Sequence, residues 1–193
     1  MSIFNFYNNV NYLNNKAINI LNRAEVMSSR LTDQKKFYKY TIKEGERADI
    51  IAYREYGDSS LDWIIYLVNN VIDPYKDWPL SDADFVKYLE KKYNRRAELL
   101  TSTLNSYAIA YYYYQGLNSD TEEEIAAYNY TISADTYDAL TPVQQSGWVA
   151  KSIWDYEKEI NESKREIVLL RSVYINEFVQ QFKDLFINGW YTK

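Results

Sequence analysis

The stretch FYKYTIKEGERADIIAYREYGDSSLDWIIYLVNN, residues 37–70, decides the fold prediction. Residues 37–43 alternate apolar and polar side chains and are rich in Tyr, Thr and Ile, which is typical of a half-buried strand. Glu44 and Gly45 then turn the chain. Apolar side chains return at helical spacing, and Gly57 stands where a left-handed helix cap belongs. We therefore expect a strand followed by a helix.

A second helix is expected directly after Gly57. Asp58 and the two serines that follow it offer side-chain oxygens for the start of a helix. Four apolar side chains then fall on one side of the helix: Leu61, Ile64, Ile65 and Val68. Asn69 and Asn70 favour turns over helix interiors, and Pro74 cannot continue a helix. The expected order is strand, helix, helix and an extended segment punctuated by prolines.

Two segments downstream carry clear local patterns. Ser81 or Asp82 can cap a third short helix that runs to about Tyr93, because apolar side chains recur there at helical spacing. Residues 105–135 are rich in β-branched and aromatic residues, so we expect them to be extended. They include four adjacent tyrosines: Tyr111, Tyr112, Tyr113 and Tyr114. Four large rings cannot all be buried on one face of a lone strand, so we expect something to pair with it.

The segment from Trp148 to Phe186 contains no Pro or Gly and allows two interpretations. Apolar residues at three-four spacing suit one long helix. Alternation across residues 147–156 instead suits a strand, followed by a helix of about 27 residues that starts near Asn161 and spans roughly 40 Å. The later part of that helix would carry one continuous apolar stripe: Ile167, Leu170, Tyr174, Phe178, Phe182 and Leu185. The stripe fits packing on the chain's own core as well as docking on a neighbour.

The N-terminal segment, residues 1–36, is rich in Asn and has only loosely helical spacing, through Ile18, Leu21 and Val26. It fits a weak helix or an arm that becomes ordered on a partner, and equally a plain flexible terminus. Residues 1–20 lack the features of a signal peptide, so we expect the chain to be made and kept in a cytoplasm.

The residue inventory leaves little room for catalysis. The chain has no Cys and no His, which excludes disulfides, thiol nucleophiles, the common zinc sites and His general bases. Carboxylate pairs of the glycosidase kind stay possible, but 27 acidic residues produce many accidental pairs and none lies in a recognisable motif. We therefore expect no catalytic residue, no metal and no cofactor.

Charge and hydropathy argue against nucleic acid and membrane partners. The net charge is -5, and the 22 Lys and Arg residues are scattered among the acids without forming a basic stripe. Residues 99–119 carry no charge, but their Thr, Ser, Asn, Gln and Tyr side chains are too polar for a membrane span.

Aromatic residues are in excess: 21 Tyr, 7 Phe and 5 Trp make 17% of the chain. Tyr and Trp combine a large apolar face with a polar tip and are enriched in protein interfaces, so the excess favours a chain that is contacted by other proteins. Trp63 shares a short helix with apolar neighbours and is expected in the core. Trp78, held in an extended segment by the proline after it, fits an interface as well as a core, and Tyr75 lies close by.

Residues 40–57, YTIKEGERADIIAYREYG, resemble the opening of a LysM module. That family has a strand ending in Tyr-Thr-Val-Lys-x-Gly and a helix of the Leu-x-x-Ile-Ala-x-x-Tyr-Gly kind. The resemblance implies a small β-α-α-β fold of the sort that binds N-acetylglucosamine polymers. The chain departs from the family where the closing Gly-Gln-x-Leu-x-Ile-Pro strand is expected, because DWPLSDADFVKYL stands there.

A longer series of motifs resembles the baseplate wedge proteins of contractile-tailed, T4-like phages, a family with a LysM-like core. The matching motifs lie, in order, at Ile51–Gly57, Trp63, Asn70–Pro74, Trp78–Ser81 and Asn161–Arg165. The resemblance implies a structural virion protein, present in six copies, that joins adjacent wedges around the tail tube and sheath attachment. It also implies other wedge proteins and a sheath-initiator-type protein as partners, and assembly in the host cytoplasm.

Taken together, we expect an α+β fold: a β-α-α-β LysM-like module with an extra helix, an extended tyrosine-rich segment and a long C-terminal helix. The expected segments are an N-terminal arm (1–36), the module (37–93), a tyrosine-rich connection (94–147) and a strand with the long helix (148–193). The alternative function is glycan binding to peptidoglycan or chitin. The candidate protein interface comprises Tyr75, Trp78, Tyr111, Tyr112, Tyr113, Tyr114, Tyr174, Phe178 and Phe182.

Overall fold

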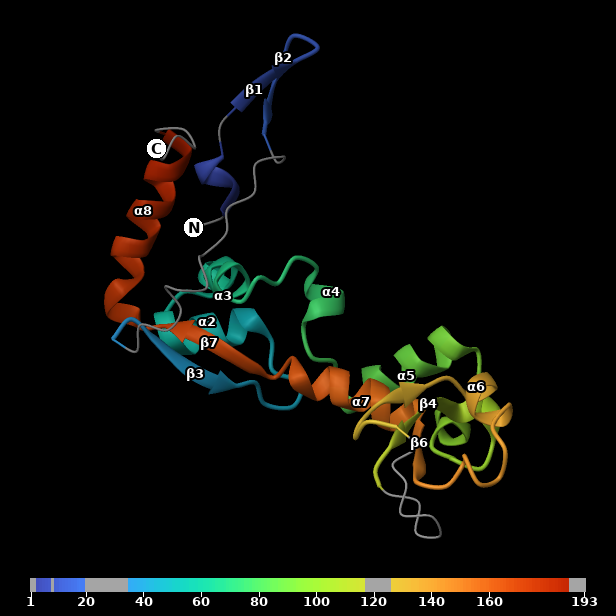
Figure 1. Ribbon diagram of the computed structural model, residues 1–193. Coiled ribbons are helices and arrows are strands. Elements are labelled where there is room, and N and C mark those ends of the chain that lie inside the picture. The colour runs from blue at the N-terminus through green and yellow to red at the C-terminus, as the bar shows by residue number, and fades with distance from the viewer. Residues whose placement is uncertain (1–2, 8, 20–34, 117–125, 188–193) are drawn as a thin grey trace. The chain divides into compact units, whose positions relative to one another are not determined.

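The computed structural model describes residues 3–7, 9–19, 35–116 and 126–187. The chain has the expected α+β fold and forms two compact units (Figure 1). Unit 1 contains Met1–Pro79 and Lys164–Lys193, and unit 2 contains Leu80–Ser163. Unit 2 is therefore an insertion in the sequence of unit 1, a division that differs from the four segments expected above.

Unit 1 is built on a two-stranded antiparallel sheet. Strand β3 (Phe37–Thr41), expected from the alternation in its sequence, pairs with strand β7 (Glu166–Leu170). The register runs from Phe37 opposite Leu170 to Thr41 opposite Glu166. The strand that completes the sheet therefore follows unit 2 in the sequence and does not come from the segment directly after the second helix.

The two helices expected after β3 are present. Helix α2 (Ala48–Tyr56) ends at Gly57, whose φ of 77° is left-handed and whose N–H donates to the Tyr53 carbonyl at 2.9 Å. A 3-10 turn, η2 (Ser59–Leu61), is capped by the Asp58 carboxylate and leads into α3 (Asp62–Val68). The capping residues thus set both helix boundaries, as the sequence indicated.

The prediction of one long C-terminal helix that starts near Asn161 is wrong. Helix α7 (Ile153–Ser163) begins before Asn161 and ends two residues after it. Strand β7 follows, and a 3-10 turn, η5 (Ser172–Tyr174), then leads into helix α8 (Ile175–Ile187). The run Ile167–Leu170 is a strand because it pairs with β3 and packs one face into each of two core clusters, with Ile167 and Leu169 in one and Leu170 in the other. These distant contacts override its three-four spacing. The stripe is therefore divided between β7, η5 and α8.

The N-terminal segment contains strands, where a weak helix or an arm was expected. A 3-10 turn, η1 (Ile3–Phe6), precedes a hairpin of β1 (Asn9–Tyr12) and β2 (Asn15–Ile18). Leu13 and Asn14 form the loop with positive φ angles of 46° and 63°, the conformation that two-residue hairpin loops require. Ile18 lies on β2, whereas Leu21 and Val26 are outside the described residues.

Unit 2 begins with the third expected helix, α5 (Asp82–Tyr93), capped by the Ser81 hydroxyl, which accepts from the Asp84 N–H. Asn94, with a left-handed φ of 50°, ends α5, and the short 3-10 turns η3 (Ala97–Leu100) and η4 (Ser106–Ala108) follow. The predicted end of this helix at about Tyr93 is therefore confirmed.

A three-stranded antiparallel sheet completes unit 2, with the order β5-β4-β6. Its strands are β4 (Ile109–Tyr114), β5 (Thr131–Ile132) and β6 (Trp148–Ser152), and helix α6 (Ala134–Asp138) follows β5. The tyrosine strand lies in the centre of this sheet, so its partners come from the same chain. The acidic run at residues 120–124 lies outside the described residues.

Two asparagines bind backbone groups far away in the sequence. The Asn69 side chain accepts from the Val168 N–H at 2.7 Å and donates to the Val168 carbonyl at 2.8 Å, as a neighbouring strand would. In unit 2, buried Asn161 binds Leu80 in the same way, accepting at 2.8 Å and donating at 3.1 Å. Each asparagine therefore holds two distant segments of its own unit together.

Candidate protein-binding surfaces

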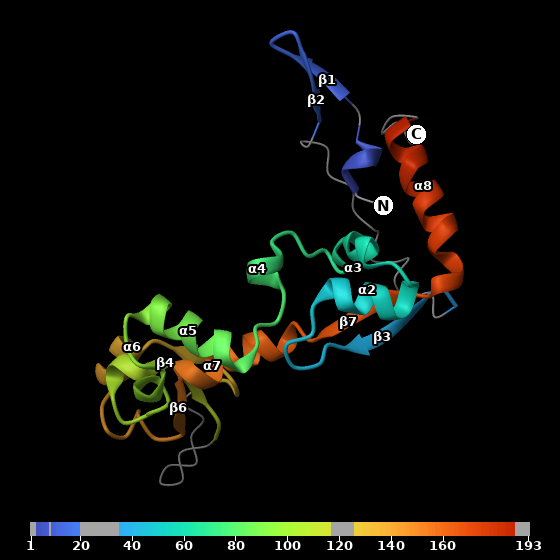
Figure 2. The same ribbon diagram turned by 180° about the vertical axis from the view of Figure 1, so that it is seen from behind.

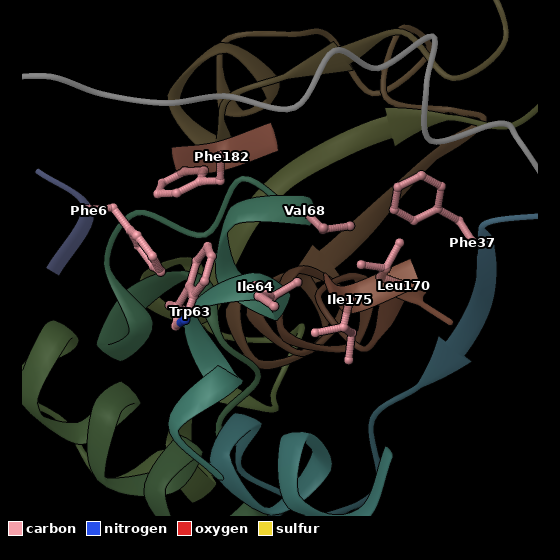
Figure 3. Packing of buried hydrophobic residues seen from close by; sticks show 8 residues of the cluster. All are labelled: Phe6, Phe37, Trp63, Ile64, Val68, Leu170, Ile175 and Phe182. Atoms are coloured by element: carbon pink, nitrogen blue, oxygen red, sulfur yellow. The ribbon is translucent and has the colours of Figure 1, made fainter. Parts of the chain in front are cut away.

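The aromatic side chains on α8 pack inside unit 1. Trp63 on α3 lies at the centre of a ring cluster, with ring centroids 4.9 Å from Phe182, 5.5 Å from Phe6 and 6.4 Å from Phe178. Figure 3 shows the Phe6, Trp63 and Phe182 rings turned toward one another, with Ile64 and Val68 leading to a second group around Leu170. This cluster fixes η1 and α8 to α3, and it confirms the core position expected for Trp63.

Trp78 is buried in unit 1, with 9% of its surface exposed. Its indole N–H donates to the Glu46 carbonyl at 2.9 Å, and its ring meets Tyr66 edge-on at 5.6 Å. The Trp78-Pro79 segment, where the first part of unit 1 ends, is therefore held against the residues that precede α2. Tyr75, on the short helix α4 (Pro74–Asp77), is 90% exposed and available to a partner.

The four tyrosines of β4 alternate between the two faces of the sheet. Tyr112 stacks on Tyr137 at 3.7 Å, and fully buried Tyr114 meets Trp148 at 5.4 Å. Tyr111 and Tyr113 lie on the other face, 6.2 Å apart and half-buried. This alternation is the period-two geometry of a central strand.

Three of the nine predicted interface residues are therefore buried. Trp78, Tyr114 and Phe182 contact this chain's own side chains, which corrects the expectation that they face a partner, because pattern alone cannot separate a buried ring from an interfacial one. Phe178 and Tyr174 are partly covered in unit 1, and Lys36 lies 5.4 Å from the Tyr174 ring centre. For Tyr75, Tyr111, Tyr112 and Tyr113 an interface role stays a prediction.

A groove in unit 1 was missed by the sequence reasoning. It has a volume of about 640 Å³ and lies between η1 and the region from η2 to α4. Its apolar lining includes Ile3, Phe4, Tyr7, Trp63, Leu67 and Ile72. Phe4 and Ile72 are 52% and 67% exposed there. The sequence feature that could have indicated this groove is the apolar Ile3-Phe4 pair at the start of an otherwise polar segment.

Asp62 lies at the edge of this groove and accepts from the Trp63 N–H at 2.9 Å. Burial raises the pKa of the Asp62 carboxyl above its ordinary value, and the nearby Asp49 charge adds to the rise. The groove is thus an apolar surface with an acidic edge.

Among the residues that the structure describes, the most buried carboxylate belongs to Glu157 in unit 2, which is 4% exposed. It accepts hydrogen bonds from Tyr93 at 2.6 Å and Lys92 at 2.7 Å. Burial acts to raise the pKa of Glu157, but these charged and hydroxyl donors outweigh it, so the pKa is lowered. A lowered pKa keeps the carboxylate ionised, opposite to what a general acid needs, so the group acts as a structural anchor for α5 and α7.

We expect Glu157 to make the stability of unit 2 fall in acid. A lowered folded-state pKa stabilises the fold above the unfolded-state value of about 4.5, and this contribution is lost as pH falls through the folded-state pKa. Thermal unfolding measured from pH 7 to pH 3 should therefore show a smaller decline for Glu157→Gln than for the wild type. Glu98→Gln, at an exposed position in the same unit, is the matched control. A Glu157→Gln profile parallel to the wild-type profile contradicts this role.

In the part of the chain that is described, no group of three or more Asp or Glu side chains gathers in a way that could hold a metal ion. Among the same residues, no helix is long and apolar enough to cross a bilayer.

Comparison with known proteins gives a match over almost the whole sequence. The family model of the phage base plate wedge protein 53 matches residues 2–185. The chain belongs to the base plate wedge protein 53 family. No curated protein matches it.

Membership in the base plate wedge protein 53 family indicates a structural role in the baseplate, contact with other baseplate proteins and location in the virion tail. It also suggests that the chain is not an enzyme. The family match covers residues of both units, including the inserted unit 2.

Proposed function

We propose that this chain joins adjacent wedges of a contractile-tail baseplate, around the tail tube and the sheath attachment, through protein contacts alone. The observation that carries the proposal is the exposure of large apolar side chains on both units of a wedge-family chain. Among the described residues, twelve of them are more than half exposed: Phe4, Tyr12, Leu13, Ile50, Tyr53, Ile72, Tyr75, Leu104, Tyr128, Tyr130, Val143 and Val173. Phe4 and Ile72 line the same groove of unit 1, and apolar side chains that share one surface mark sites where other proteins bind.

The proposed partners are other baseplate wedge proteins and a sheath-initiator-type protein, with six copies of the chain in each baseplate and assembly in the host cytoplasm. Two units linked through a single chain support a bridging role, because each unit has its own core and its own exposed apolar residues. The proposed role requires no catalytic group.

We also infer that unit 1 is a LysM-like module that has accepted unit 2 as an insertion. Support comes from its order β3, α2, α3, β7 with antiparallel strands, which is the β-α-α-β order. This order favours one second candidate function, glycan binding. Salt-resistant retention of the purified chain on peptidoglycan, lost on disruption of unit 1, would establish that second function.

Site-specific photo-cross-linking tests the bridging role. A photoreactive phenylalanine analogue replaces Tyr75 in unit 1 or Leu104 in unit 2, which are 90% and 94% exposed and therefore tolerate substitution. Cross-links are compared between isolated wedges and complete baseplates. A bridging chain gives at least one cross-link to another baseplate protein that appears only in complete baseplates. Identical cross-links in both preparations would falsify the proposal that the chain joins adjacent wedges.

A further inference from the structure

The two edges of the sheet in unit 1 differ in how their backbone groups are bound. Ile42 donates to the Arg165 carbonyl and Arg171 donates to the Lys36 carbonyl, at 2.9 and 2.8 Å. In an antiparallel pair, residues alternate between facing the partner strand and facing away from it. The even-numbered residues of β3 therefore bind β7 through their backbone, and the backbone groups of Phe37, Lys39 and Thr41 point to the outer edge.

The outer edge of β7 is bound at its centre, whereas the outer edge of β3 is open. On β7, the outward N–H and carbonyl of Val168 are both bound by the Asn69 side chain. On β3, the outward backbone groups of Phe37, Lys39 and Thr41 have no hydrogen-bond partner among the residues that the structure describes. Both ribbon views place β7 between β3 and helix α3, with β3 on the outside (Figures 1 and 2).

The open edge carries positive charge in a chain whose net charge is negative. Lys39 lies in the middle of β3 and Lys43 follows the strand, both exposed, and neither forms an ion pair within the described part of the chain. Lysine at a sheet edge discourages pairing with neutral or basic strands. The same charge attracts an acidic strand, because opposite charges beside the new ladder are stabilising.

We propose that the outer edge of β3 accepts an extended, acidic segment of a neighbouring baseplate protein, which adds a third strand to the sheet of unit 1. The inference rests on the proposed function, because that function supplies the neighbour. Strand addition uses backbone hydrogen bonds for affinity and side-chain charge for selectivity. It also completes a sheet of three strands, which is more stable than two.

Substitutions at Lys39 separate backbone pairing from charge. Lys39→Pro removes the outward N–H and places a ring on the edge, but it removes no hydrogen bond to β7. Lys39→Thr keeps the N–H and strand propensity and is the matched control. Lys39→Glu keeps the N–H and reverses the charge. Each variant replaces the natural chain in the phage, and its copies per particle are counted by mass spectrometry against another baseplate protein.

We expect incorporation to fall about tenfold for Lys39→Pro and for Lys39→Glu, and less than about threefold for Lys39→Thr. Equal incorporation of Lys39→Pro and Lys39→Thr overturns strand addition. Wild-type incorporation of Lys39→Glu overturns the acidic partner. If the wild-type chain itself is missing from particles, the proposed function fails, and this inference fails with it.

Amide exchange keeps the test decisive if Lys39→Pro folds poorly. Amide hydrogen exchange of the wild-type chain is measured residue by residue, once for the free chain and once for the chain within particles. The Lys39 amide should exchange rapidly in the free chain and at least about tenfold more slowly in particles, while the Tyr38 amide, already bound to β7, changes much less. A Lys39 amide that exchanges equally fast in both states overturns the proposal.

Discussion

Replacement of Trp63 by alanine is expected to lower the free energy of unfolding of unit 1 by about 3–5 kcal/mol, the usual cost of removing a buried tryptophan. Trp63 is 5% exposed, and its ring contacts Phe6, Phe178 and Phe182. Together with Trp63 on α3, these rings come from three separate parts of the chain, so the variant removes the contact that holds η1 and α8 to α3. Urea unfolding followed by circular dichroism measures the loss.

Two variants sharpen this prediction. Trp63→Phe keeps an aromatic ring in the cluster and is expected to recover about half of the loss. Tyr53→Ala, at a 67% exposed position on α2, should change the unfolding free energy by about 0.5 kcal/mol or less. Amide exchange along α8 should accelerate in Trp63→Ala before global unfolding. If α8 stays as protected as in the wild type, Trp63 is not what fixes it.

The elements that the sequence predicted well are those fixed by neighbouring residues. Gly57 ends α2 with a left-handed φ, and the oxygens of Asp58 and Ser81 start the next helical segments through bonds to N–H groups two or three residues away. Such signals lie within one turn of the boundary that they set, so they can be interpreted without knowledge of the tertiary fold.

The elements that the sequence did not predict depend on distant partners. The run at β7 has helical spacing, and only pairing with β3 makes it a strand. A related reason explains why the sequence could not separate buried aromatic residues from exposed ones. Tyr75 and Trp78 lie three positions apart in the same segment, yet one is 90% exposed and the other bonds to the Glu46 carbonyl in the core. Their local sequence does not distinguish these outcomes.

Asn69→Leu is expected to destabilise unit 1 by about 2–4 kcal/mol, because leucine matches the side chain in size but leaves the Val168 N–H and carbonyl without partners. The contact joins residues 99 positions apart and holds the strand that returns after unit 2. Asn70→Gly is the matched control. Asn70 has a left-handed φ of 55°, which glycine adopts freely, so that variant should change stability by about 1 kcal/mol or less.

Asn69→Asp tests the hydrogen bonds themselves, because it changes almost nothing in shape. An ionised carboxylate still accepts from the Val168 N–H, but it meets the Val168 carbonyl with a second acceptor, which should raise the folded-state pKa of the new aspartate. A raised pKa means that the protonated form, which can donate, stabilises the fold at low pH, and that this contribution is lost as pH rises. The stability gap between Asn69→Asp and wild type should therefore narrow from pH 7 toward pH 4. A gap that stays constant over this range would show that β7 is held by packing and its bonds to β3, with the asparagine contributing only its volume.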